Sequence, residues 1–298
     1  GQFQLSLIAL FEFICLVGIL VLGLGPLYAA VSYATARILG TFIMFCYLRH
    51  TTPWLTPGIR GVRIGIMKRL FMPSIAAMAF PLGNVFNIQG IRIVVGMILG
   101  PVAVTTLTTL RTLTRIALIL LRSVNTIIQP EMGYAYGLRD MNLMRKLHRR
   151  SFQVNLWGSL IVILGLIVFG DLFLIHWTDG KVKMDFTLFA LFTAASAINV
   201  LWASSLMVSF ATNRHTQIAK AFFLINLSGL ILAYVFGPKF GLSGVGVIIL
   251  CIELFMVSFV IQRSIEMTED SWFKFIAIVK RPPEFLLDVI KEKKYYND

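Results

Sequence analysis

The sequence predicts an all-α protein that crosses a membrane with about eight helices. Hydrophobic residues make up 57% of the 298 residues and charged residues only 14%, against roughly 45–50% and 25% in soluble domains. The apolar runs are continuous over about 20 residues, which is the length a helix needs to cross a bilayer. They lack the alternation of lipid-facing barrel strands, so helices are preferred to a barrel.

Glycine, proline and charged residues divide the apolar sequence into eight candidate spans. These are expected near residues 5–23, 27–48, 71–98, 104–129, 152–170, 186–212, 218–236 and 244–263. A cleaved signal peptide does not fit the first span, because Glu12 interrupts it and no basic flank precedes it. The first apolar run begins within five residues of Gly1, with no initiator Met. We therefore expect an amino-terminally truncated fragment of a longer protein.

Loop charges predict the orientation of these spans. One side receives the basic runs in residues 49–69, 139–150 and 214–220 and the Lys-rich tail after Arg263. The other side receives three lysines and three aspartates, namely Lys181, Lys183, Lys239, Asp171, Asp179 and Asp185. The positive-inside rule makes the first side cytoplasmic and places both termini of the chain there. Orientation thus accounts for the net charge of +13, and the dispersed basic residues do not form a nucleic-acid-binding stripe.

Two segments outside the spans are expected to lie at the cytoplasmic surface. Residues 49–70 contain Pro53, Pro57 and a basic run, and predict a linker between domains followed by a short interfacial helix. Residues 264–298 form a tail in which four apolar residues have helical spacing: Trp272, Phe275, Ile276 and Val279. We expect helices lying on the leaflet, with lysines drawn to anionic headgroups. For residues 284–298 a partly disordered tail is an equal alternative.

Four arginines lie in the third and fourth spans, neither of which contains a carboxylate: Arg92, Arg111, Arg115 and Arg122. A guanidinium at bilayer depth costs several kcal/mol, so such residues normally face a bundle interior or a watery cavity. With about 100° of rotation per residue, six side chains of the fourth span fall in one stripe: Thr108, Arg111, Arg115, Arg122, Asn125 and Gln129. This pattern predicts a cavity that favours an anion. Alternatively, Arg111 and Arg122 snorkel to the helix ends.

The third span combines Pro81, Asn84, Asn87 and Gly90 with Arg92. This composition predicts a helix broken near mid-membrane, as in transporters whose discontinuous helices line a binding site. The alternative is an ordinary proline kink with polar contacts between helices. We take Asn84, Asn87 and Asn125, together with the four arginines, as candidate substrate-binding residues.

Carboxylates within the predicted spans are scarce. Glu253 lies in the middle of the eighth span and is a candidate for ion coupling, for an ion pair or for a hydrogen-bonded neutral acid. Residues 25–37 laid on 241–253 align weakly and place Arg37 at the position of Glu253, so Arg37 is a second candidate. Such a correspondence is consistent with a two-lobed transporter.

The sequence gives no sign of catalysis or metal binding. His50, His148 and His215 are expected in cytoplasmic turns or the linker, and the three cysteines lie in separate spans without metal-like spacing. No phosphate-binding glycine loop is present. We expect neither a cofactor nor a metal. The longest outer loop, about residues 171–185, is poor in acid–base pairs, which disfavours a membrane glycosyltransferase, polymerase or ligase.

Several short stretches resemble one family of exporters. They are Arg111-Thr112-Leu113-Thr114-Arg115, Gln129-Pro130-Glu131, Tyr136-Gly137-Leu138-Arg139-Asp140, Arg145-Lys146-Leu147-His148-Arg149, Asn213-Arg214-His215-Thr216 and Pro238-Lys239-Phe240-Gly241-Leu242-Ser243-Gly244. Their order is similar to that of the polysaccharide biosynthesis proteins, the O-antigen type flippases, of the multidrug/oligosaccharidyl-lipid/polysaccharide exporter superfamily. The resemblance covers residues 71–263 well and 5–48 loosely.

The resemblance implies a bundle of twelve to fourteen helices in two lobes that flips undecaprenyl-pyrophosphate-linked oligosaccharide across the bacterial inner membrane by alternating access. Residues 1–48 would be the last two helices of the amino-terminal lobe, 49–70 the inter-lobe linker, 71–263 the six-helix carboxy-terminal lobe and 264–298 the interfacial tail. The expected partners are the anionic lipid-linked oligosaccharide, membrane lipids and other polysaccharide assembly proteins. A cation-coupled multidrug exporter of the same superfamily is the alternative.

Overall fold

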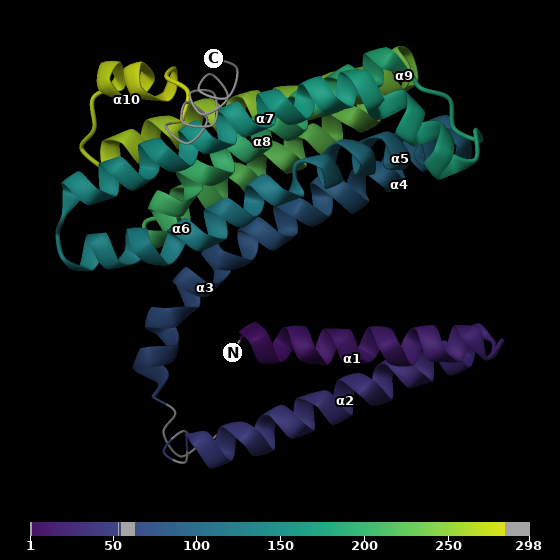
Figure 1. Cartoon of the computed structure of the whole chain (residues 1–298), viewed down its shortest axis with the longest axis horizontal. Helices are drawn as coiled ribbons and strands as arrows, with labels where there is room; N and C mark the ends of the chain where they lie inside the picture. The colour runs from purple at the N-terminus through teal and green to yellow at the C-terminus, as the bar shows by residue number, and fades with distance from the viewer. Residues whose placement is uncertain (1, 53, 55–62, 284–298) are drawn as a thin grey trace, which may run out of the picture. The chain divides into compact units, whose positions relative to one another are not determined.

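The computed structural model describes residues 2–52, 54 and 63–283, and throughout these residues the regular structure is helical, with no strand (Figure 1). The prediction of an all-α chain is therefore confirmed. The chain divides into two compact units, residues 1–67 and 68–298. The division falls in the predicted linker, of which Pro53, Pro57 and the rest of 55–62 lie outside the described residues.

The first unit is a helical hairpin made of α1 (Gln2–Val21) and α2 (Pro26–Thr51). The turn contains Gly23, whose φ of +68° lies in the left-handed region that glycine adopts without strain, and Pro26 begins α2. A Cβ on Gly40 would lie 2.8 Å from a side-chain carbon of Ile8, so this glycine permits close packing of the helices.

The second unit contains the remaining elements of the described chain, except that the first four residues of α3 (Ile64–Val85) belong to the first unit. These elements are α3, the π-helix η1 (Phe86–Gly90), α4 (Ile91–Leu99), α5 (Pro101–Ala117), α6 (Ile119–Gly137), α7 (Met141–Thr178), α8 (Phe186–Ala211), α9 (Thr216–Met267) and α10 (Trp272–Val279). The helix α8 packs against α5, α6, α7 and α9 and so forms the centre of this bundle. Aspartates cap two of the helices: Asp140 accepts from Asn142 and Leu143 at the start of α7, and Asp185 accepts from Leu188 in α8.

The seventh and eighth predicted spans are the two halves of α9. Gly241 separates them with non-helical backbone angles, φ 61° and ψ −155°. The halves pack on each other, because a Cβ on Gly229 in the first would lie 2.3 Å from Ile252 Cδ1 in the second. The chain therefore reverses at Gly241, where an L side chain would be strained.

The fourth predicted span is not one continuous helix. It breaks at Leu118, whose φ is −100° and ψ 1°, and α5 and residues 121–137 of α6 are inclined by 52°. No proline or glycine stands at the break, but Leu118 is buried against Ala197 and Val200 of α8. Tertiary packing therefore accounts for the bend, which the helical periodicity of the sequence could not predict.

Five helical stretches of the described chain are individually long and apolar enough to cross a membrane. They are residues 26–51, 78–99, 141–178, 186–211 and 216–267, and the bent α5–α6 pair is a sixth if it forms one span. The apolar stretch 6–21 of α1 is shorter. By length and composition these helices are compatible with a membrane protein, while the predicted count of eight spans, the membrane and the orientation remain predictions.

Candidate functional site: an arginine-lined cavity

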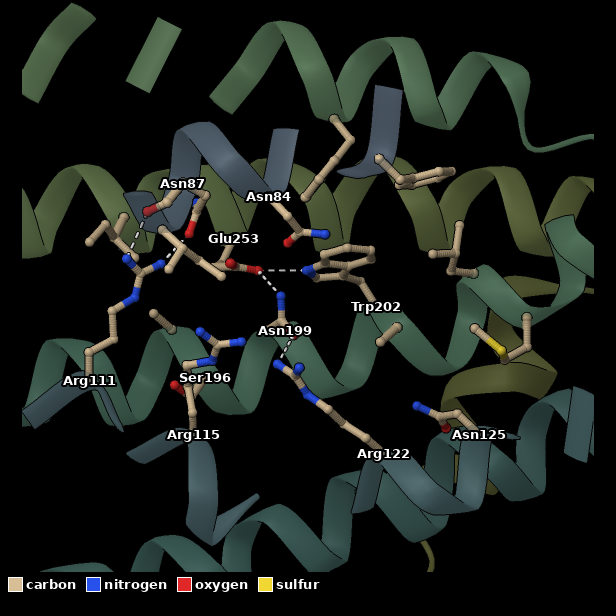
Figure 2. A pocket seen from close by; sticks show the side chains of 18 of the residues that line it. Asn84, Asn87, Arg111, Arg115, Arg122, Asn125, Ser196, Asn199, Trp202 and Glu253 are labelled. Carbon is tan, nitrogen blue, oxygen red and sulfur yellow. Dashed lines mark hydrogen bonds between the residues drawn. The ribbon is translucent and has the colours of Figure 1, made fainter. Parts of the chain in front are cut away.

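A cavity of about 380 Å³ lies inside the second unit, between α3, η1, α5, α6, α8 and α9 (Figure 2). Its polar lining consists of Asn84, Asn87, Arg111, Arg115, Arg122, Asn125, Thr126, Gln129, Ser196, Asn199 and Glu253. Its apolar lining includes five aromatic side chains, Phe80, Phe192, Trp202, Phe210 and Phe222. The cavity therefore presents cationic, amide and aromatic groups to one space.

Six of the seven candidate substrate-binding residues line this cavity: Asn84, Asn87, Arg111, Arg115, Arg122 and Asn125. The seventh, Arg92, lies outside the lining, and its Nη1 donates to Gln89 Oε1 at 3.4 Å. Within the predicted stripe of the fourth span, Gln129 faces the cavity and Thr108 does not. The bend at Leu118 thus leaves five of the six stripe residues around the same space.

Arg111 is fixed by the π-helical segment. Its Nη1 donates to the backbone carbonyl of Asn87 at 2.8 Å, and its Nη2 donates to Asn87 Oδ1. The Asn87 amide in turn donates to Asn226 Oδ1 of α9 at 2.5 Å. A π-helical turn commonly marks a functional position in a helix, and here it presents a backbone carbonyl to a guanidinium. The third span is not broken as predicted: α3, η1 and α4 follow one another without interruption, the only departure being the π-helical turn at residues 86–90, and Pro81 lies inside α3.

Arg122 is linked to Glu253 through an amide. Its Nη2 donates to Asn199 Oδ1 at 2.6 Å, and Asn199 Nδ2 donates to Glu253 Oε2 at 3.0 Å. The same carboxylate oxygen accepts from Trp202 Nε1 at 2.6 Å. Two donors therefore hold the buried Glu253 side chain in one orientation (Figure 2). Among the described residues the Glu253 carboxylate accepts hydrogen bonds from neutral donors and forms no ion pair.

Arg37, the second candidate for ion coupling or pairing, belongs to the hairpin unit. Its Nε lies 2.8 Å from Glu12 Oε1, and the Arg37 side chain is 56% exposed while that of Glu12 is 5% exposed. Tyr33 Oη also accepts from Arg37 at 3.2 Å. This ion pair links α1 to α2 within the hairpin.

Arg115 differs from its two neighbours. No hydrogen bond or ion pair to its guanidinium occurs among the described residues, although it is half-buried and lines the cavity. Electrostatic repulsion couples it to both Arg111 and Arg122. The three cations share the cavity with the single carboxylate of Glu253, so the lining carries excess positive charge. A bound anion would relieve this repulsion.

Sequence reasoning missed the contribution of α8. Ser196, Asn199 and Trp202 line the cavity from this helix, and the spacing of Ser196 and Asn199 in an otherwise apolar run was the available signal. Asn226 of α9 was also missed. The expectation for His148 was wrong: it is fully buried within α7, where Nε2 lies 3.0 Å from Ser205 Oγ. The helix α7 begins at Met141, well before the predicted span of residues 152–170, and therefore includes His148, which was expected in a turn.

The described residues hold no cluster of three or more His, Cys, Asp or Glu side chains that could bind a metal ion. The polar groups that line the cavity are guanidinium donors, amides, hydroxyls and one carboxylate. Comparison with protein-family models, with curated proteins and with solved structures finds no match.

Proposed function

We propose that this chain belongs to a transporter that moves an anionic, lipid-linked oligosaccharide across the bacterial inner membrane for the synthesis of a cell-surface polysaccharide such as lipopolysaccharide. The observation that carries the proposal is the guanidinium of Arg115, which has no hydrogen-bond or ion-pair partner among the described residues and lies between two anchored arginines in one cavity. The sequence resemblance to polysaccharide exporters, which includes the stretch from Arg111 to Arg115, also supports it. In this proposal the protein is no enzyme, spans the membrane eight times and has cytoplasmic termini.

The pyrophosphate of the lipid carrier suits the cationic lining. It carries about two negative charges, and arginine binds such groups with forked, charge-assisted hydrogen bonds that strengthen in a low-dielectric site. Asn87 already engages two donors of Arg111, and Asn199 engages one of Arg122, so both side chains are preorganised. Arg115, whose guanidinium has no partner in the described part of the chain, offers its donors to the pyrophosphate.

The aromatic part of the lining suits the sugar next to the pyrophosphate. Trp202 and Phe222 have ring centroids 5.7 Å apart, and Phe80 lies 5.6 Å from Phe222. Aromatic faces pack against the C–H faces of sugar rings, while Asn84, Asn125 and Gln129 can bond hydroxyl groups. A volume of about 380 Å³ accommodates the head of the carrier and the adjoining sugar. Longer chains require the cavity to open during alternating access.

A transport assay tests the proposal. Wild-type and Arg115→Ala proteins are reconstituted in vesicles, and the fraction of a fluorescent pyrophosphate-linked glycolipid that reaches the far leaflet is measured. Loss of flipping with unchanged abundance and folding is expected for Arg115→Ala. Arg115→Lys should rescue only in part, because the forked contact is lost. Equal flipping rates for wild type and Arg115→Ala would overturn the proposal.

A cation-coupled multidrug exporter is the second candidate, because the buried Glu253 carboxylate and several aromatic rings share the same cavity. A lipophilic cation would need that carboxylate to outweigh three arginines. Binding of a lipophilic cation that Glu253→Gln abolishes, together with no binding of the pyrophosphate lipid, would favour this alternative.

A further inference from the structure

A second cavity, of about 910 Å³, lies where α10 meets the first half of α7, apart from the arginine-lined cavity. Its walls come from α7, from the turn between α9 and α10, from α10 itself and from residues 281–283. In Figure 1 the yellow helix α10 lies beside the end of the bundle, and contacts between α10 and α7 place the two elements together. The proposed transport does not use this cavity.

Side chains of α7 hold α10 in place, so the two helices that line the cavity are fixed relative to each other. The Arg149 guanidinium binds the Asp270 carboxylate through two hydrogen bonds, of which Nε to Oδ2 measures 2.7 Å. Gln153 Nε2 donates to the carbonyl of Ile278, near the end of α10, at 3.2 Å and to that of Arg281, two residues beyond the helix, at 2.6 Å. These contacts hold the carboxy-terminal end of α10 and the residue that follows its cap against α7.

Apolar packing adds to these contacts. Phe275 is buried, with its ring centroid 5.1 Å from those of His148 and Phe152. Val279 is buried beside it, and Trp157 Nε1 donates to the Val279 carbonyl at 3.3 Å. One face of α10 therefore packs firmly on α7.

The lining of this cavity is strongly basic. Six of its residues are cationic and two are acidic: Arg145, Lys146, Arg149, Arg150, Lys274 and Arg281 against Glu269 and Asp270. One of the two carboxylates, that of Asp270, is already bound by Arg149. The exposed side chains of Lys146 and Lys274 face the cavity from α7 and α10. The cavity therefore attracts an anion even without the contributions of Arg149 and Arg150.

The other face of α10 is apolar and exposed. Trp272 is 47% exposed, Phe273 88% and Ile276 42%. A short helix with exposed aromatic residues, next to lysines and arginines, is typical of a segment that lies in a membrane interface. A soluble anion would not require such a face, whereas a lipid would meet the basic cavity and the apolar side chains together.

We propose that this cavity binds the phosphate of an anionic phospholipid headgroup, with the acyl chains lying against the exposed face of α10. Lysine supplies point charges and arginine supplies forked donors to phosphate oxygens. The site would anchor α10 and the amino-terminal half of α7 to one leaflet of the membrane. On the predicted orientation this is the cytoplasmic leaflet.

Lipid retention in nanodiscs tests the site. The full chain is reconstituted in phosphatidylcholine with a minor fraction of phosphatidylglycerol, and the lipids retained after extraction are counted by native mass spectrometry. We expect wild type to retain phosphatidylglycerol preferentially. Each lysine near an anionic membrane surface contributes about a fivefold gain in affinity, so Lys146→Gln/Lys274→Gln should bind phosphatidylglycerol about 25-fold more weakly.

Control variants show whether the loss of phosphatidylglycerol retention depends on the two cavity lysines. Lys220→Gln removes an exposed lysine outside the cavity and should retain phosphatidylglycerol as wild type does. Lys146→Arg/Lys274→Arg should also retain it, which separates loss of charge from loss of fold.

Two results would overturn the proposal. One is equal retention of phosphatidylglycerol by wild type and by the double glutamine variant. The other is displacement of the lipid by millimolar inorganic phosphate or glycerol 3-phosphate, which would assign the cavity to a soluble phosphate and not to a lipid. The retention assay does not depend on transport, so a negative result in the flipping assay would leave the conclusion about this cavity unchanged.

Discussion

The guanidinium of Arg111 and the backbone carbonyl of Asn87 are joined by a hydrogen bond of 2.8 Å between α5 and the π-helical segment. The same Asn87 side chain accepts from Arg111 and donates to Asn226 at 2.5 Å. A helix irregularity, an arginine and a second asparagine thus form one network that ties α5 and α9 to η1. This network positions the cationic wall of the cavity.

Removing Asn87 should destabilise the bundle. Asn87→Leu leaves both the Arg111 guanidinium and the Asn226 amide short of a partner, which costs about 1–3 kcal/mol for each unpaired buried group. Thermal unfolding in detergent should show a lower midpoint for Asn87→Leu and for Asn226→Leu. The double variant should lose less than the sum, because the two residues share one bond. Additive losses would contradict a shared network.

Asn199 should couple Arg122 to Glu253 energetically. It accepts from Arg122 at 2.6 Å and donates to Glu253 at 3.0 Å, so Asn199→Ala removes both contacts. A double-mutant cycle of Arg122→Ala with Glu253→Gln should show a coupling energy of about 0.5–3 kcal/mol. That coupling should shrink in the Asn199→Ala background. Coupling of the same size in both backgrounds would mean that the amide does not transmit it.

Glycine at position 229 should be required where the halves of α9 pack. A Cβ there would lie 2.3 Å from Ile252 Cδ1, in the buried interior, so Gly229→Ala should lower stability by about 1–3 kcal/mol. Ile252→Val in the same chain should restore part of the loss by shortening the opposing side chain. Gly165→Ala is the matched control, since nothing lies within 4 Å of a Cβ at Gly165. Equal melting temperatures for the two alanine variants would exclude this tight contact.

The docking of α10 should weaken in acid. Burial alone would raise the pKa of the Asp270 carboxyl, but hydrogen bonds from Arg149 and the Ser271 amide outweigh it and hold the pKa below its ordinary value, which is about 3.9. The stabilisation is therefore fully present above the ordinary pKa and is lost as the pH falls through the lower pKa of the folded state.

Hydrogen exchange of the amides in residues 272–279 measures this effect. Exchange should be slow at neutral pH and should accelerate, after correction for the intrinsic rate, as the pH drops below about 4. Asp270→Asn should remove this acid-dependent step. A step of the same size in Asp270→Asn would assign it to another group.

The helices could be predicted from the sequence because membrane-length apolar runs are continuous and their breaks carry glycine or proline. Gly241 illustrates this, since it separates the two halves of α9 at the predicted place. Leu118 illustrates the limit: nothing in its local sequence breaks a helix, and its burial against α8 depends on the assembled bundle. The buried position of His148 likewise follows from the full length of α7 and from Phe275 packing on it.

The candidate site was predictable along single helices and not between them. Helical periodicity placed Arg111, Arg115 and Arg122 on one face, and all three line the cavity. The partners of Arg111 and Arg122 involve α8, α9 and η1, whose rotation about their axes the sequence does not specify. The bonds of Asn199 and Trp202 to Glu253 therefore became visible only in the assembled fold.

The measurement that tests the central claim most directly is equilibrium binding of a short-chain polyprenyl pyrophosphate to the purified chain. A charge-assisted hydrogen bond contributes about 1.5–3 kcal/mol, so Arg115→Ala should raise the dissociation constant about 10- to 150-fold. Arg92→Ala is the control, because Arg92 lies outside the cavity lining. Its dissociation constant should stay within about twofold of the wild-type value, since substitutions away from a site usually have small effects. Equal dissociation constants for wild type and Arg115→Ala would contradict the account.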